Sequence, residues 1–402
     1  MPGPDAIIIG AGPAGLAAAH ELNARGLETV ILEKEGCVGA VWRRHYDRLH
    51  LHTPRSTSSL PGLKMPTAFG RYPSRSQFVE YLESYAAKFA LKPRFGAAVK
   101  AVRRDGGGWL AEAGAHSTTA TIIVVATGWA DFPYLPTWPG MDSFKGPILH
   151  SSAYRNPNSF AGKRTLVVGF GNSGAEIALD LCEAAVEVAL SVRSPVCVLP
   201  RDFLGIPVVN LAIAQRFLPA GLVDALNAPL LRLVVGSVEG LGMKQADKGP
   251  VRMIKEEGRV PVLDVGTVAK IRDGKIKVRP AIEVFAMDGV RFADGRKEGF
   301  DSVILATGFR PDLRTLLPDA RGVLDASGKP LVSDRHTAEP GLYFIGAIAV
   351  PTGQFREIGI GAVRIANDAR RHLRMQGLPR AHSTEFTVPR DATPSARQPS
   401  HR

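Results

Sequence analysis

The sequence predicts an α/β protein in which one β-α-β unit is inserted into another. The loops at residues 10–15 and 169–174 repeat one glycine pattern, Gly-x-Gly-x-x-Gly, about 160 residues apart. Each loop follows an apolar run and opens a segment typical of a helix, which is the order strand, turn, helix. Two matching strand ends, at residues 122–128 and 303–308, flank the second loop. Together these features indicate two Rossmann-like dinucleotide-binding domains, with the second inserted into the first.

The first unit begins almost at the N-terminus. The apolar run 6–9 predicts a buried strand, and the glycine loop 10–15 leads from it into a helix rich in alanine and leucine. We expect that helix to run to Arg25, because Gly26 is a typical helix stop. Residues 28–32 then predict the second strand. The segment is a complete β-α-β unit.

The second unit repeats this order in the middle of the chain. Residues 165–168 predict a strand, the loop 169–174 a turn, and the following residues a helix to about Ala185. A further strand is predicted at residues 186–192.

The matching strand ends suggest where the two domains divide. We interpret residues 122–128 and 303–308 as the points where the chain leaves and re-enters the first domain. The predicted boundaries are 1–160 and 301–379 for the first domain, 161–300 for the second and 380–402 for a tail. The tail is rich in Ser, Pro, Thr, Arg and His without periodicity, which predicts disorder.

The glycines of each loop suit a dinucleotide. They permit a tight turn, a close approach of the backbone to a pyrophosphate and tight packing of helix on strand, while the helix N-terminus offers free amides to the phosphates. The predicted binding residues of the two loops are Gly10, Gly12, Pro13, Ala14 and Gly15, and Gly169, Gly171, Asn172, Ser173 and Gly174.

The residue that follows the second strand distinguishes the two sites. Glu33 lies 18 residues after Gly15, where a carboxylate can accept both ribose hydroxyls of FAD or NAD. The equivalent place in the second unit, 19 residues after Gly174, holds Arg193, followed by Ser194. A guanidinium there would bind a 2′-phosphate, which predicts NADPH, unless Arg193 is merely a solvated surface residue.

Composition excludes several other classes of protein. The chain is 45% apolar and 22% charged, as globular proteins are. Its formal net charge is +12, but Arg and Lys are spread along the whole chain with no compact basic run, so we expect no nucleic-acid partner. The cationic balance favours anionic ligands instead. The scattered cysteines Cys37, Cys182 and Cys197 form no Cys-x-x-Cys pair, which argues against a zinc site or a disulfide framework.

The sequence also indicates the compartment. Residues 1–9 show neither a charged leader nor a small-residue cleavage site, so we expect no signal peptide and a cytoplasmic protein. The most apolar later stretch, 203–235, is interrupted by Arg216, Asp224 and Arg232, among others, which predicts no transmembrane helix. We expect packed helices there, with a helix on a membrane surface as the alternative.

A third motif identifies a family. The pattern Phe-x-Gly-x-x-x-His-x-x-x-Tyr occurs as Phe144, Gly146, His150 and Tyr154, just before the second glycine loop. With this fingerprint in place, the chain resembles the class B flavin-containing monooxygenases from about residue 5 to residue 375. It is most similar to the YUCCA type, which converts indole-3-pyruvate to the auxin indole-3-acetate. Segments that carry this closer likeness are Tyr46–His52, Tyr72–Phe78, Gly171–Gly174 and Pro261–Thr267.

The resemblance implies a mechanism. FAD would occupy the first site and NADPH the second; NADPH would reduce the flavin, and oxygen would add to it as a C4a-hydroperoxide sheltered by bound NADP⁺. The cofactor would supply the difficult chemistry. The implied reaction is oxidative decarboxylation of an aromatic 2-keto acid such as indole-3-pyruvate, with N- or S-oxygenation of another small molecule as the alternative. The partners would be the substrate and molecular oxygen, and a homo-oligomer is possible.

The resemblance also suggests individual residues. Trp42, Thr127, Gly128 and Gln354 fall in segments that contact FAD in the family, although Trp42 could be a core anchor and Gln354 an exposed loop amide. His52 falls where relatives run beside the flavin ring and is the one candidate catalytic residue. With His50 it could equally form one face of a strand.

The sequence departs from the family pattern in two places, and three rival functions have to be weighed. Residues 346–355 resemble general flavin monooxygenases more than the YUCCA type, and the active-site asparagine of the animal enzymes has no clear match near His52. A disulfide reductase needs a redox cysteine pair, which the chain lacks, and a Baeyer-Villiger enzyme would show Trp in place of Tyr154. A non-catalytic flavin-binding protein would tolerate decay of a glycine loop or of the fingerprint, and both are intact.

Overall fold

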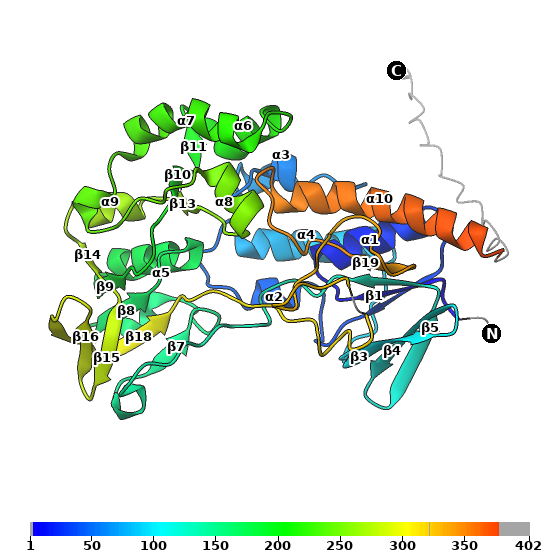
Figure 1. The fold of residues 1–402 in the computed structure, drawn as a ribbon, viewed down its shortest axis with the longest axis horizontal. Coiled ribbons are helices and arrows are strands. Elements are labelled where there is room, and N and C mark those ends of the chain that lie inside the picture. Colours follow the sequence, from blue (N-terminus) through cyan, green and yellow to red (C-terminus); the bar gives the residue numbers. More distant parts are fainter. Residues whose placement is uncertain (1–2, 321, 378–402) are drawn as a thin grey trace, which may run out of the picture.

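A computed structural model describes residues 3–320 and 322–377 and places two parallel sheets toward opposite ends of the molecule (Figure 1). The residues predicted to form the tail, 380–402, lie outside the described part of the chain. The mixed α/β architecture confirms the predicted fold class.

The first sheet contains the predicted N-terminal unit. Its four strands are parallel, short and almost entirely apolar, as strands covered on both faces must be. In spatial order they are β19 (Leu342–Phe344), β6 (Ile122–Val125), β1 (Ala6–Ile9) and β2 (Thr29–Leu32). Because β19 pairs with β6 across the whole second unit, the predicted insertion is present.

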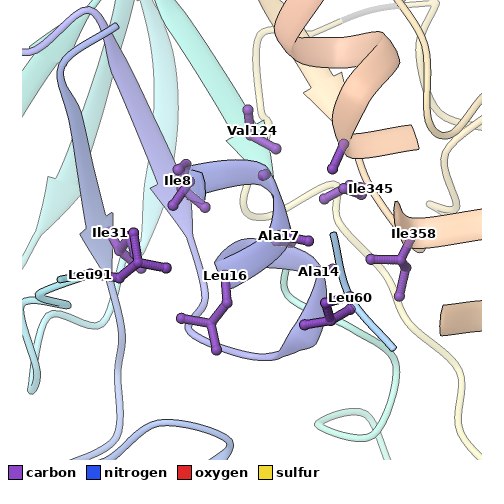
Figure 2. Packing of buried hydrophobic residues seen from close by; sticks show 14 of the residues in the cluster. Ile8, Ala14, Leu16, Ala17, Ile31, Leu60, Leu91, Val124, Ile345 and Ile358 are labelled. Atoms are coloured by element: carbon purple, nitrogen blue, oxygen red, sulfur yellow. The ribbon is translucent and has the colours of Figure 1, made fainter. Parts of the chain in front are cut away.

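Helix α1 (Pro13–Asn23) packs between this sheet and α10 (Gln354–Met375). Its small alanines let α10 approach closely, and Figure 2 shows Ala14 and Ala17 between Ile8 of β1 and Ile358 of α10. Both termini of α1 follow the sequence: Pro13 begins the helix, and Gly26 follows its end at a φ of +78°.

Further elements extend the first unit. Helix α4 (Arg75–Lys88) begins with a capping box in which Ser74 and Gln77 exchange side-chain and backbone hydrogen bonds. An antiparallel sheet covers the strands from the other side. The remaining elements here are α2 (Ala40–Arg43), α3 (Arg55–Ser58), η1 (Thr67–Phe69), β3 (Ala101–Asp105), β4 (Gly108–Ala113) and β5 (His116–Ala120).

The second sheet contains the repeat of this unit. Its five parallel strands are, in spatial order, β14 (Ile276–Arg279), β9 (Glu187–Ser191), β8 (Arg164–Val168), β18 (Ser302–Leu305) and β7 (Ile148–His150). Accompanying elements are η2 (Met141–Ser143), η3 (Pro157–Phe160), α5 (Asn172–Glu183), α9 (Thr267–Arg272), β15 (Ile282–Ala286), β16 (Gly289–Phe292) and β17 (Lys297–Gly299).

The two matching strand ends are equivalent positions of the two repeats. β6 pairs with β1, and β18 pairs with β8, so each is the strand beside the first strand of its own unit. The interpretation of residues 303–308 as the re-entry into the first domain is therefore wrong, because β18 and β7 both belong to the second sheet. A buried apolar strand followed by Ala-Thr-Gly reads the same in either sheet.

A smaller group of elements covers the second unit and faces the first. It contains β10 (Val198–Pro200), β11 (Asp202–Phe203), β12 (Ile206–Pro207), α6 (Val208–Ala214), α7 (Ala220–Val235), η4 (Glu239–Leu241), α8 (Pro250–Glu257) and β13 (Val262–Asp264). No helix in residues 3–320 or 322–377 is long and apolar enough to cross a membrane. The stretch 203–235 does form helices, as predicted, but much of their outer face is exposed.

Candidate functional site

A cavity of about 800 Å³ lies where the two units meet. Its wall includes twelve of the residues that the sequence assigned to cofactors or catalysis: Gly10, Gly12, Pro13, Ala14, Glu33, Trp42, His52, Thr127, Gly128, Asn172, Ser173 and Gln354. The cavity thus joins both glycine loops to one space.

The first loop has the geometry that a pyrophosphate requires. A Cβ on Gly10, at a φ of +106°, would lie 2.6 Å from the Ala126 carbonyl oxygen, and one on Gly15 would lie 1.9 Å from the Gly10 carbonyl oxygen. Those two glycines let strand, helix and neighbouring strand approach closely. A Cβ on Gly12, in contrast, would have no protein atom within 4 Å and would project into open space. That space, at the N-terminus of α1, suits a phosphate group.

The side chain of Glu33 lies directly beside this loop. Its carboxylate is buried and accepts hydrogen bonds from the backbone N–H of Ala11, at 2.6 Å, and of Glu35, at 2.9 Å. The acid therefore fixes the loop and lines the cavity at once. Its position at the end of β2 suits contact with a ribose.

Helix α10 points its N-terminus at the same cavity. Gln354 is its first residue, and the buried Nε2 of Gln354 has no hydrogen-bond partner among the described residues. The buried Nε1 of Trp129, another wall residue, also lacks one. Because buried donors in native proteins are almost always satisfied, these two atoms fit a polar ligand such as FAD.

Trp42 lies in the cavity wall and also packs against the core of the first unit. Its ring lines the cavity, and it packs against Phe78 and Phe355 with centroid separations of 4.6 and 5.6 Å.

His52 connects the two units across the cavity wall. Its Nε2 forms a hydrogen bond with the carboxylate of Glu176, which is buried on α5 of the second unit. Tyr46, also on the wall, is buried beside Glu176; burial first, and then the Glu176 charge, raises the pKa of Tyr46 well above its ordinary value. Nearby, burial lowers the pKa of His45 to about 4, with Arg155 the next cause, so His45 is neutral at physiological pH.

The comparisons with known proteins agree with this geometry. The family model described as pyridine nucleotide-disulphide oxidoreductase matches residues 7–199. Indole-3-pyruvate monooxygenase YUCCA1 of rice, Oryza sativa subsp. japonica, is 42% identical over 85% of this chain and 86% of its own length. The probable indole-3-pyruvate monooxygenase YUCCA4 of Arabidopsis thaliana is 40% identical over 86% and 85%. The chain belongs to the YUCCA family of flavin monooxygenases.

Solved structures support the same fold. A flavin-containing monooxygenase from Stenotrophomonas maltophilia aligns with 91% of this chain and 99% of its own, at 27% identity and a TM-score of 0.69. A bacillithiol disulfide reductase from Staphylococcus aureus aligns with a TM-score of 0.65 at 17% identity, which shows the shared fold alone. The predicted family resemblance and the predicted enzyme class, an NADPH-dependent flavin monooxygenase, are thus confirmed.

The fingerprint of this YUCCA-family chain lies outside the cavity wall. His150 is buried, with Nε2 3.1 Å from the Gly308 carbonyl oxygen, and burial lowers the pKa of His150. Tyr154 donates to Asp180 of α5 at 2.7 Å, and Phe144 is buried in the core of the second unit. These four residues therefore hold the segment 144–154 against the second unit. A Cβ on Gly146 would lie 2.4 Å from the Asp301 carbonyl oxygen, which explains that glycine.

The segment 261–267 is held by the second glycine loop. Asn172 accepts from the backbone N–H of Leu263 at 2.7 Å and donates to the Pro261 carbonyl at 3.2 Å. Thr267 donates to the Ala175 carbonyl at 2.9 Å. One side chain of the predicted NADPH loop thus also positions a wall of the cavity.

Ten predicted site residues do not line the cavity. They are the four fingerprint residues, together with Gly15, Gly169, Gly171, Gly174, Arg193 and Ser194. Arg193 and Ser194 are exposed just beyond the end of β9, and Arg193 has no hydrogen-bond or ion-pair partner in residues 3–320 or 322–377.

Sequence reasoning missed the apolar part of the wall. It comes from α6, α7 and α8, with Leu211, Val223, Leu230 and Ile254 among its residues. Gln215 and Asn227 join α6 to α7 by a reciprocal pair of amide hydrogen bonds of 3.3 and 2.9 Å. The apolar stretch 203–235 was the available signal, but it does not state which side faces the site.

All three cysteines are free thiols. Cys197 is buried, and burial raises the pKa of its thiol to about 11. It is therefore not a reactive thiolate at physiological pH.

Proposed function

We propose that this chain oxidatively decarboxylates an aromatic 2-keto acid such as indole-3-pyruvate, with indole-3-acetate, an auxin, as the product. The observation that carries this proposal is the 42% identity to the rice indole-3-pyruvate monooxygenase across 85% of the chain. The overall reaction consumes the keto acid, NADPH, one proton and O₂, and yields the shortened acid, CO₂, NADP⁺ and water. One oxygen atom enters the acid and the other becomes water.

FAD and NADPH are the cofactors, as predicted for a member of this family. When bound, FAD accepts a hydride from NADPH and activates oxygen, chemistry that side chains do not supply. We assign FAD to the first unit, with Gly12, Glu33 and Gln354 around it. We assign NADPH to the second, with Ser173 at the cavity and Arg193 toward the 2′-phosphate.

The chain's own residues would position the reactants and exclude water. The apolar wall of α6, α7 and α8 gives an aromatic side chain a dry surface, and exclusion of water favours coupled oxygenation over loss of oxidising equivalents. His52 would act as a positioning residue, since Glu176 holds its ring at the junction of the units.

The assignments of compartment and domains are proposals too. We propose a cytoplasmic enzyme that takes a small-molecule substrate and molecular oxygen, in keeping with its free cysteines. We propose that the NADPH-binding domain includes β7 and β18 as well as residues 161–300, since both strands lie in its sheet.

Product analysis tests the proposed reaction. Purified enzyme with NADPH and oxygen should release indole-3-acetate and CO₂ in step with NADPH consumption when it receives indole-3-pyruvate. Phenylpyruvate and a thioether are the comparison substrates. If indole-3-pyruvate persists while NADPH oxidation gives hydrogen peroxide, and the thioether or an amine is oxygenated efficiently, the keto-acid assignment fails.

A further inference from the structure

One surface of the molecule concentrates exposed apolar side chains. Eight of the fifteen large hydrophobic residues exposed in the described part of the chain lie between residues 204 and 234. We call them the hairpin surface: Leu204, Ile206, Phe217, Leu218, Leu222, Leu226, Leu233 and Val234. They belong to the β11–β12 turn and β12, the α6–α7 connection and α7, and Figure 1 shows α6 and α7 at the outer edge of the second unit.

Helix α7 carries this surface at regular spacing. Leu222, Leu226, Pro229 and Leu233 are all exposed and follow each other at i, i+4, i+7 and i+11, which is one face of an α-helix. The opposite side of the same helix contributes Asn227 and Leu231 to the cavity wall. A helix that is apolar on both sides needs a cover for its outer face, because exposed apolar patches mark interaction sites.

The charges in this region identify the kind of cover. Residues 204–235 contain three charged side chains, Arg216, Asp224 and Arg232. Asp224 is buried, and it accepts from the backbone N–H of Val251 at 2.9 Å and of Arg252 at 3.0 Å. The exposed charges are therefore both cations.

An exposed arginine of this region also packs on an exposed aromatic ring. Arg216 stacks over the ring of Phe217, with its guanidinium carbon 4.1 Å from the ring centroid. Phe217 and Leu233 are each 82% exposed and Leu204 87%, so three apolar tips project from this surface. Apolar tips flanked by arginine are typical of segments that lie in a membrane interface, where the tips enter the acyl boundary and the cations meet headgroups.

We propose that the hairpin surface docks this enzyme on an anionic lipid bilayer, without spanning it. A second copy of the chain fits less well, because a symmetric contact would bring together two copies of the segment 204–235, whose exposed charges, Arg216 and Arg232, are both positive. An anionic bilayer complements both features, since lipid buries the apolar tips and attracts Arg216 and Arg232.

Vesicle co-sedimentation of the full-length holoenzyme tests this proposal. The protein should sediment with phosphatidylcholine vesicles that contain phosphatidylglycerol, and at least about tenfold less with phosphatidylcholine alone. The triple variant Leu204→Ser, Phe217→Ser, Leu233→Ser should lose binding to both. The matched control Leu135→Ser, Met287→Ser, Met375→Ser removes three exposed apolar residues elsewhere and should bind as the wild type does.

A second variant separates charge from folding damage. Arg216→Glu, Arg232→Glu keeps every apolar residue and should abolish the preference for anionic vesicles, with flavin content and NADPH oxidation unchanged. If the wild type binds neither type of vesicle, the proposal is overturned. It is also overturned if the control triple variant loses as much binding as the hairpin triple variant. Sedimentation velocity that shows a dimer abolished only by the hairpin triple variant would assign the surface to a second copy instead.

Discussion

The two glycine loops share one geometry but have different surroundings. Gly10 and Gly169 have φ angles of 106° and 105°, and a Cβ on either would lie 2.6 Å from the carbonyl oxygen of Ala126 or Ala306. The loops coincide because the requirements are the same: a turn that only glycine adopts and a close neighbouring strand. The backbone geometry of the loops therefore does not by itself distinguish one nucleotide from another.

The difference lies at the end of the second strand. Glu33 is buried against the first loop and touches the cavity, whereas Arg193 is exposed in the second unit and reaches neither the loop nor the cavity wall. A carboxylate suits a ribose held deep in the protein, and a guanidinium suits a doubly charged phosphate at the surface. We propose that the glycine loop binds the pyrophosphate in each unit and that this one residue selects the nucleotide.

The largest effects are expected when the two glycine loops are altered one at a time. Gly12→Val fills the space that we assign to the FAD pyrophosphate, so the protein should purify without flavin. Gly171 has the same open surroundings, and Gly171→Val should keep the yellow colour but lose saturation by NADPH. Visible absorbance relative to protein absorbance measures the first, and NADPH titration the second. Full flavin content in Gly12→Val would show that the first loop is misassigned.

The next effect concerns the link between the units. His52→Ala leaves the buried carboxylate of Glu176 without its imidazole partner, which should cost about 3 kcal/mol of unfolding free energy. Adding Glu176→Gln should recover part of the loss, because a neutral amide is cheaper to bury. Urea denaturation of both variants and of His116→Gln, an exposed histidine on β5, gives the comparison. If wild type and His52→Ala have equal free energies of unfolding, the contact between His52 and Glu176 does not stabilise the fold.

Nucleotide choice gives a smaller effect. Arg193→Ala should weaken the binding of NADPH by roughly 1.5–3 kcal/mol, about ten- to a hundredfold in affinity, because one charge-assisted hydrogen bond is lost. NADH, which lacks the 2′-phosphate, should be unaffected. Steady-state kinetics with both coenzymes measures the ratio, with the exposed Arg232→Ala as control. A variant equally impaired with both would remove Arg193 from phosphate recognition.

Local patterns predicted the elements, but the sheet membership required the structure. The run Ala6–Ile9 is β1 as expected, because a strand buried on both faces must be apolar throughout. Val303 lies in an equally apolar run, yet its strand joins the second sheet by pairing with β8. Pairing between strands over a hundred residues apart leaves no local trace.

The candidate site divides in the same way. Gly12 was predictable because a close approach of backbone to phosphate demands glycine at a fixed spacing. The contact of His52 with Glu176 joins residues 124 positions apart, and neither side chain indicates its partner. The exposure of Leu226 was hidden as well, since a leucine every three or four residues is equally typical of a core.

The smallest expected effect compares one histidine from each unit, the partly buried His45 and the buried His150, and in both cases desolvation lowers the pKa. For His45 the folded value is about 4 against an ordinary 6.5, so below pH 6.5 the unfolded chain takes up a proton that the folded protein refuses. Its stabilising contribution is complete above pH 6.5 and is lost progressively down to about pH 4, with about 2 kcal/mol gone by pH 5.

The variant His45→Gln cannot take up that proton. Between pH 7 and pH 5 its free energy of unfolding, measured in urea, should therefore fall by about 2 kcal/mol less than that of the wild type. An identical loss in both proteins would mean that His45 is not held neutral, and His150→Gln shows whether the second unit shares the acid sensitivity of the first.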